Sequence, residues 1–160
     1  MKLISQSLLD ELASAATASP RRRSHYNLHA SNADLVQRYL VVANRDSYFR
    51  PHRHNTRAEL ALIVRGALDL LAFDEHGLLT ARHALGAGSA NLAYENAAGG
   101  WHTVIVREDG TAFLEIKQGP YDPATASEFA GWAPAEGDAG VARFLEWARR
   151  AAPGERTPMR

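Results

Sequence analysis

The feature that most constrains the fold is a series of short segments, rich in apolar and β-branched residues, between residues 35 and 118. Segments of this length, interrupted by turn residues, are typical of strands in a β-barrel or β-sandwich. Glycines mark the turns at Gly66, Gly77 and Gly110. We read strands at residues 35–43, 48–54, 59–65, 67–73, 78–84, 89–93, 101–107 and 111–118. The sequence therefore predicts an all-β-dominated fold.

Both ends of the chain show a different periodicity. Apolar residues three or four positions apart predict a helix over about residues 4–17 and another over about residues 140–152. The barrel occupies the middle, at about residues 35–118. A chain of 160 residues suits one domain, so we expect a single domain over residues 1–160.

Composition excludes several classes of protein. Lys+Arg and Asp+Glu both total 18. This balance argues against a nucleic-acid binder, because such proteins usually carry an excess of basic residues. Cysteine is absent, so disulfides and thiolate metal sites are excluded, and any metal must bind nitrogen and oxygen. No apolar run approaches the ~20 residues of a membrane helix, and polar residues interrupt the N-terminal stretch too often for a good signal peptide. We expect a cytoplasmic protein with no membrane partner.

A set of histidines and one glutamate carries the clearest chemical signal. His52 and His54 are two residues apart, so in a strand their imidazoles share a face. Glu59 begins the next predicted strand after a short turn, where an antiparallel partner would return beside the histidines. His102 begins a later strand. Three imidazoles and a carboxylate suit one divalent ion such as Zn, Fe, Ni, Mn or Co.

The spacing of these residues resembles the cupin superfamily. The pattern His-x-His, four residues, Glu, six residues, Gly, from His52 to Gly66, is similar to the first cupin motif. Gly99 and His102 fit part of the second motif. The sequence departs from the two motifs at Asp46, Asn91, Ala97 and Val106. The resemblance implies a single cupin barrel, a double-stranded β-helix or jelly-roll, with a metal on the four named residues.

A closer resemblance rests on several further motifs. The chain is similar to the WbuC family of bacterial cupin-fold metalloproteins, which is often associated with surface-polysaccharide gene clusters. The motifs that carry it are PRRRSHYNLH at 20–29, YxxPHRH at 48–54, GWHT at 100–103, ExKxGPY at 115–121 and WAPxE at 132–136. The resemblance implies a role in polysaccharide biosynthesis but supplies no reaction.

Strand alternation extends the candidate site beyond the metal ligands. Tyr48 and Arg50 would share a face with the histidines and lie beside the metal as substrate contacts. Glu115 and Lys117 would form an acid/base pair if their face is internal. The alternative is an outward-facing salt bridge on a strand whose Leu114 faces the core. The sequence leaves both orientations open.

The segment before the barrel supplies further candidates. If it is extended, His25, Asn27 and His29 line the barrel mouth, where His25 could move protons; if it is helical, the two histidines meet. Arg23 belongs to a local excess of basic residues that suggests a small polar or anionic ligand, although a solvated basic face explains it equally well. Trp101 either walls the pocket or packs in the core.

Three functions fit these candidates. The first is a metal-dependent isomerase, epimerase or lyase acting on a sugar or sugar nucleotide. The second is an Fe(II)-dependent dioxygenase, and the third is a non-catalytic ligand-binding module. By analogy with other single cupin barrels, we expect a homodimer.

Overall fold

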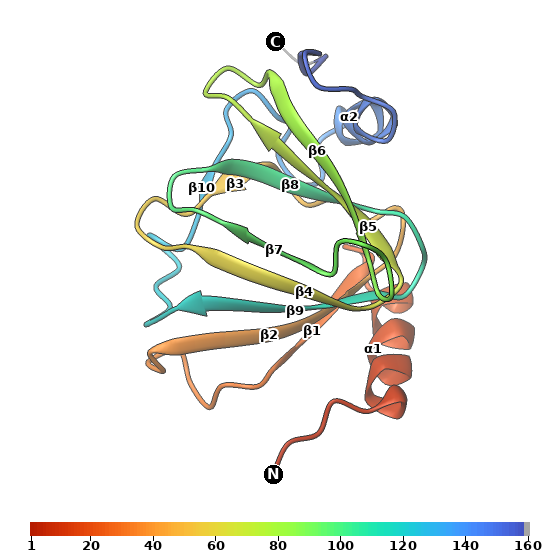
Figure 1. Ribbon diagram of the computed structural model, residues 1–160, viewed down its shortest axis with the longest axis vertical. Helices are drawn as coiled ribbons and strands as arrows, with labels where there is room; N and C mark the ends of the chain where they lie inside the picture. Colours follow the sequence, from red (N-terminus) through yellow and green to blue (C-terminus); the bar gives the residue numbers. More distant parts are fainter. Residues whose placement is uncertain (159–160) are drawn as a thin grey trace.

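A computed structural model of the protein describes residues 1–158 (Figure 1). Two five-stranded antiparallel sheets face each other, with strand orders β1-β2-β9-β4-β7 and β10-β3-β8-β5-β6. The elements are α1 (Gln6–Ala18), β1 (Arg23–Asn27), β2 (Val36–Ala43), β3 (His52–Arg53), β4 (Glu59–Arg65), β5 (Ala67–Phe73), β6 (Leu79–Gly86), β7 (Ala93–Asn96), β8 (Trp101–Val106), β9 (Thr111–Gln118), β10 (Glu128–Phe129) and α2 (Val141–Ala148). The predicted all-β-dominated fold with a helix at each end is confirmed.

The space between the sheets is apolar at one end and polar at the other. Phe113 of β9 lies between Val41 of β2 and Ile63 of β4, and all three belong to one buried cluster. Two and four residues further along β9, the same inner face carries Glu115 and Lys117. Because alternate residues of a strand share a face, this change of residue type along β9 divides the interior into a core and a site.

Helix α1 covers the outer face of the first sheet. Its Leu9 packs on Leu40, Val42 and Ala112, which point away from the barrel interior. The Ser5 hydroxyl accepts a hydrogen bond from Leu8 N–H at 3.3 Å and caps the helix. The helix therefore begins after Ser5, slightly later than the predicted residue 4.

The C-terminal segment covers the outer face of the second sheet. Phe144 and Trp147 of α2 pack in a cluster with Phe73 of β5 and Ile105 of β8. The helix ends at Ala148 instead of the predicted residue 152. The Arg82 guanidinium donates hydrogen bonds to the carbonyls of Ala148, Arg149 and Ala151, each at 2.9 Å. It thereby provides hydrogen-bond partners for carbonyl groups at the C-terminal end of α2.

Several strand boundaries differ from the predictions. The strand predicted at 48–54 is reduced to His52–Arg53, because Pro51 has no N–H for a ladder hydrogen bond and residues 48–51 run irregularly. The strand predicted at 89–93 lies instead at Ala93–Asn96. The barrel also extends beyond the predicted range 35–118, because β1 and β10 add an edge strand to each sheet.

Gly66 is required by the turn between β4 and β5. Its φ angle is 72°, and a Cβ at this position would lie 2.6 Å from the Thr111 hydroxyl. This is the glycine that closes the first cupin-like motif, so the motif glycine holds the turn that follows the metal-ligand strand.

No helix within residues 1–158 has the length and apolar character needed to cross a membrane.

Candidate metal centre and its cavity

The four predicted ligands come together between the two sheets. His52 of β3 pairs directly with His102 of β8, and His54 follows β3 immediately. Glu59 begins β4 on the opposite sheet. One nitrogen or oxygen atom from each of the four residues lies within 4.8 Å of the others. Residues brought from three strands therefore form one compact donor set.

Backbone carbonyls orient the imidazole rings. The Nδ1 atoms of His52, His54 and His102 lie 2.9, 2.6 and 3.1 Å from the carbonyls of Arg50, Ala126 and Gly100. A carbonyl only accepts hydrogen bonds, so Nδ1 is the donor and the lone pair is on Nε2. Each ring therefore presents Nε2 as its metal-binding atom.

The donor set fits a divalent ion. His54 Nε2 lies 2.7 Å from one Glu59 oxygen, and His102 Nε2 lies 3.6 Å from the other. His54, Glu59 and His102 are only 2%, 4% and 1% exposed. Among the described residues, His102 Nε2 is a buried nitrogen without a hydrogen-bond partner. A buried carboxylate and imidazoles with inward lone pairs match the ligands of Zn, Fe, Ni, Mn or Co.

The electrostatics of the centre favour a neutral imidazole beside an ionised carboxylate. Burial and the neighbouring His102 lower the pKa of His52 to about 3. Burial alone would raise the pKa of Glu59. The adjacent His102 and His54 rings and the charge of Lys117 outweigh it and hold that pKa well below its usual range. His52 is thus a neutral ligand and Glu59 an anionic one.

Glu115 and Lys117 face the barrel interior. Glu115 lies between Tyr39 of β2 and Ala61 of β4, and Lys117 lies beside Glu59. The Lys117 ammonium pairs with the Glu115 carboxylate and lies 3.3 Å from a Glu59 oxygen. This settles the orientation that the sequence left open, since Leu114 and Ile116 point outward instead.

The same pair has shifted pKa values. Burial raises the pKa of Glu115, and the charge of Glu59 adds to this effect while Lys117 opposes it. Burial alone would lower the pKa of Lys117, but the charges of Glu115 and Glu59 outweigh it and raise that pKa. Lys117 is therefore held as an ammonium ion between two carboxyl groups.

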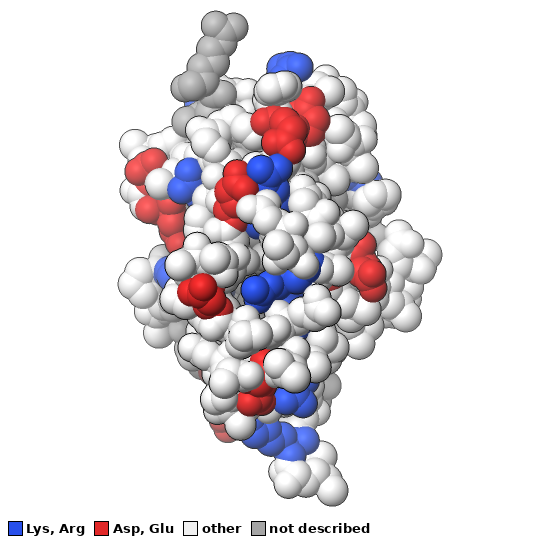
Figure 2. All heavy atoms as spheres, turned by 90° about the vertical axis from the view of Figure 1, so that its left-hand side faces the viewer, with Lys and Arg blue, Asp and Glu red and all other residues white. Residues whose placement is uncertain are grey.

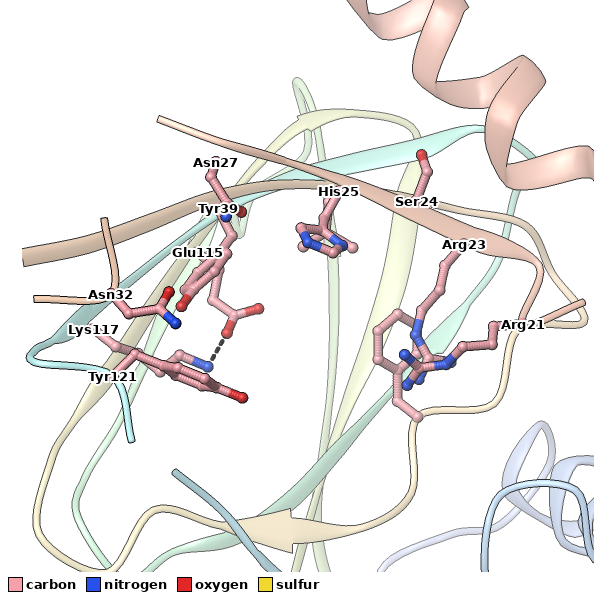
Figure 3. A pocket seen from close by; sticks show the side chains of 12 residues that line it. Arg21, Arg23, Ser24, His25, Asn27, Asn32, Tyr39, Glu115, Lys117 and Tyr121 are labelled. Atoms are coloured by element: carbon pink, nitrogen blue, oxygen red, sulfur yellow. Dashed lines mark ion pairs between the residues drawn. The ribbon is translucent and has the colours of Figure 1, made fainter. Parts of the chain in front are cut away.

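A cavity of about 390 Å³ opens beside this pair (Figure 3). Five predicted candidates line it, namely Arg23, His25, Asn27, Glu115 and Lys117. Tyr39, Asn32 and Tyr121 also line it and were missed as site residues by sequence reasoning. Tyr121 ends the ExKxGPY motif, so that motif could have indicated it. Tyr39 and Asn32 reach the cavity only through strand pairing and loop folding.

Two predicted substrate contacts lie elsewhere, and the structure corrects them. Tyr48 and Trp101 belong to the cluster on the outer face of the second sheet. The Tyr48 hydroxyl donates to the Pro134 carbonyl at 2.8 Å, and the Trp101 indole N–H donates to Glu75 at 3.0 Å. Strand alternation failed for Tyr48 because residues 48–51 are not a strand, whereas Trp101 follows the alternative of packing in the core.

Two other candidates lie outside the lining of this cavity. Arg50 donates to the Ala130 carbonyl at 2.9 Å and stacks over the Phe129 ring. His29 is buried, and its Nδ1 accepts a hydrogen bond from Arg38 N–H at 2.9 Å. Both side chains tie the segments around the barrel together.

Comparison with solved structures identifies the class of protein. Similar folds include KdgF from Halomonas sp., with 15% identity, TM-score 0.51, and coverage of 66% of this chain and 84% of that chain. Oxalate oxidase in complex with the substrate analogue glycolate has 14% identity, TM-score 0.52, and coverage of 71% and 57%. DMSP lyase DddQ from Ruegeria pomeroyi DSS-3 has 19% identity, TM-score 0.53, and coverage of 71% and 54%. The fold is a cupin jelly-roll, and its His/His/Glu/His cluster has the ligand types of a divalent-metal site.

The family within this class is given by sequence. Residues 4–85, about half of the chain, match the family described as "Domain of unknown function (DUF6016)", and the chain belongs to that family. No curated protein has significant sequence similarity to the chain. The chain spans a little more than half the length of the oxalate oxidase and DddQ chains. These structural likenesses therefore establish the fold alone.

Proposed function

We propose that the protein is a divalent-metal-dependent enzyme that acts on a small polar molecule held in the cavity beside Glu115. One observation carries the proposal. Lys117 lines the cavity and contacts both Glu59, a metal ligand, and Glu115. The metal centre and the cavity thus share a wall of charged groups, which is the arrangement that acid/base chemistry beside a metal needs.

Each residue has a distinct role in this proposal. His52, His54, Glu59 and His102 hold the ion, which when bound supplies Lewis acidity toward a carbonyl or hydroxyl oxygen. Lys117 holds the carboxylates of Glu59 and Glu115 in place through its ammonium group. A Glu115 carboxylate oxygen takes a proton from the substrate or returns it. The apolar cluster around Phe113 closes the far end of the barrel to water.

Substrate class and biological setting follow from the motifs. We infer that the protein is a WbuC-type cupin acting on a sugar-like molecule in surface-polysaccharide metabolism. Supporting this, the ExKxGPY motif supplies Glu115, Lys117 and Tyr121, all of which line the cavity. Proton transfer beside a Lewis acid suits an isomerase, epimerase or lyase. The fold alone does not choose the reaction, because cupin-fold neighbours include both an oxidase and a lyase.

The test is turnover by the metal-loaded protein on free sugars and nucleotide sugars. Glu115→Gln is expected to lower kcat by about 10²–10⁴-fold while metal content stays unchanged. Glu95→Gln, on an exposed position of β7, is the matched control and should retain activity. An unaltered kcat in Glu115→Gln, or no turnover with any sugar, would count against the proposal.

A further inference from the structure

The cationic groups of the cavity are already committed to partners within the protein. Arg21 forms a bidentate pair with Glu136, with both contacts at 2.8 Å. Arg23 lies 2.9 Å from the same carboxylate and donates to the Tyr48 carbonyl at 2.6 Å. Lys117 is held by Glu115 and Glu59. Among residues 1–158, every cation lining this cavity therefore has a carboxylate partner.

On the face of the molecule shown in Figure 2, basic and acidic side chains lie next to one another, without a large patch of a single sign. A phosphate group entering the cavity would compete with these carboxylates for the same cations, and loss of a pair leaves a carboxylate without its partner, at a cost in free energy.

The groups that remain free at the cavity mouth are an imidazole, two amides and a phenol. His25 and Asn27 project from β1, Asn32 from the following loop, and Tyr121 from the segment after β9 (Figure 3). Their side chains form no hydrogen bonds with the rest of the described chain. The Tyr121 backbone N–H donates to the Asn32 carbonyl at 2.7 Å, which holds these two residues together.

The chemistry of these groups matches hydroxyl groups. Amide, imidazole and phenol side chains can donate and accept hydrogen bonds, as a sugar hydroxyl does, whereas an ionised phosphate only accepts. The Tyr39 hydroxyl donates to Gln37 at 3.1 Å, so its ring is fixed as one wall. The volume of about 390 Å³ suits a small molecule.

We propose that His25, Asn27, Asn32 and Tyr121 bind the hydroxyl groups of an uncharged, polyhydroxylated ligand, and that the cavity discriminates against phosphorylated analogues. The proposal rests on the proposed function for one point, that the reacting end of the ligand lies at Glu115. From a local excess of arginine, the sequence suggested a small polar or anionic ligand. Because the arginines that line the cavity are paired, this proposal keeps the polar ligand and excludes the anionic one.

The experiment measures binding to the metal-loaded protein by calorimetry and ligand-observed NMR. The probes are hexoses, deoxyhexoses and N-acetylhexosamines, each as the free sugar and as its 1-phosphate. At least one free sugar is expected to bind, with its 1-phosphate at least tenfold weaker. Tighter binding of the 1-phosphates, or no binding of any free sugar, would overturn the proposal.

Variants locate the binding site. Asn27→Ala and Asn32→Ala are each expected to weaken binding of the free sugar about threefold to tenfold, as the loss of one hydrogen bond predicts. Asn91→Ala is the control, because its exposed amide bonds to Ala84 at 3.1 Å, away from the cavity. Equal affinity in all three variants would contradict the assigned site. Far-ultraviolet circular dichroism checks that each variant is folded.

The outcomes separate this inference from the proposed function. Binding of a free sugar without turnover would leave this inference standing and count against an enzyme. Turnover restricted to phosphorylated substrates would support an enzyme and overturn this inference.

Discussion

Glu59 connects the metal centre to the cavity through a single carboxylate. Its two oxygens lie 2.7 Å from His54, 3.6 Å from His102 and 3.3 Å from Lys117. The Tyr94 hydroxyl donates to it at 3.2 Å. Because Lys117 also holds Glu115, a change at one of these charges alters the balance of the others.

Removing the Lys117 ammonium group should show how it balances the charges of the two carboxylates. Lys117→Met leaves the carboxylates of Glu59 and Glu115, both mostly buried, without their shared counter-charge. We expect the free energy of unfolding of the metal-free protein to fall by about 3–5 kcal/mol, measured by urea denaturation. The double variant Lys117→Met/Glu115→Leu should recover part of this loss. Wild-type stability in the single variant would contradict the internal placement of the pair.

A second residue-scale prediction concerns acid stability. Burial alone would raise the pKa of Glu136, but the partners Arg21 and Arg23 outweigh it and lower the pKa. A carboxyl whose pKa is lower in the folded state stabilises the fold above its unfolded pKa, and this contribution is lost as pH falls through the folded pKa. The Tm, measured from pH 6 to 3, should therefore fall more steeply with decreasing pH for the wild type than for Glu136→Gln. Parallel pH profiles would contradict the pairing.

At the scale of elements, the segment between β9 and α2 completes the metal centre. The Ala126 carbonyl lies 2.6 Å from Nδ1 of His54, and β10 pairs Phe129 with His52 and Glu128 with Arg53. The Arg53 guanidinium binds both Glu128 oxygens, at 3.0 and 3.1 Å. A segment far away in sequence thus orients one ligand and covers another.

This contact predicts a local effect. Glu128→Gln should increase hydrogen exchange of the backbone across residues 119–129, with little change in global stability, because an exposed ion pair contributes only about 0–1 kcal/mol. The control is Glu146→Gln, which removes an exposed pair with Arg150 on α2. Unchanged exchange in Glu128→Gln would show that this pair does not hold the segment.

The elements also show which parts of the fold were predictable. The strands at Glu59–Arg65, Ala67–Phe73 and Thr111–Gln118 were predicted at their observed bounds, because they are apolar and end at glycine turns. The edge strand β10 was missed because it is short and defined by pairing, whereas β1 follows the extended alternative that the sequence left open for residues 25–29.

The same reasoning separates the predictable parts of the site. The spacing of His52, His54 and Glu59 reflects local strand geometry, so the donor set could be predicted. The orientation of Glu115 and Lys117 could not, because β9 is covered on both faces. Leu114 faces outward near α1, so its apolar character gave no reliable direction.

At the scale of the whole molecule, the donor set joins the two sheets. Glu59 belongs to the sheet that contains β4, whereas His52 and His102 belong to the sheet that contains β3 and β8. A ligand that binds only the folded state stabilises it by about 2.7 kcal/mol at a free concentration 100 times its Kd. A bound ion should therefore hold the sheets together at the polar end of the barrel.

Removal of the metal should lower thermal stability. Dialysis against a chelator is expected to lower the Tm by about 5–10 °C for a chain of this size, and restoring the ion should recover it. The His54→Ala variant should show no response to chelator or metal. A Tm that is insensitive to chelation in protein that contained an ion would contradict a site that joins the sheets.

Metal stoichiometry tests the central claim most directly. Elemental analysis of the purified protein, after incubation with Zn, Fe, Ni, Mn or Co and removal of free ions, should give one ion per chain. The variant His102→Ala should lose the ion, while His83→Ala, changed at an exposed histidine on β6, should keep it. Absence of a stoichiometric ion in the wild type, or an undiminished ion in His102→Ala, would contradict the assigned metal centre.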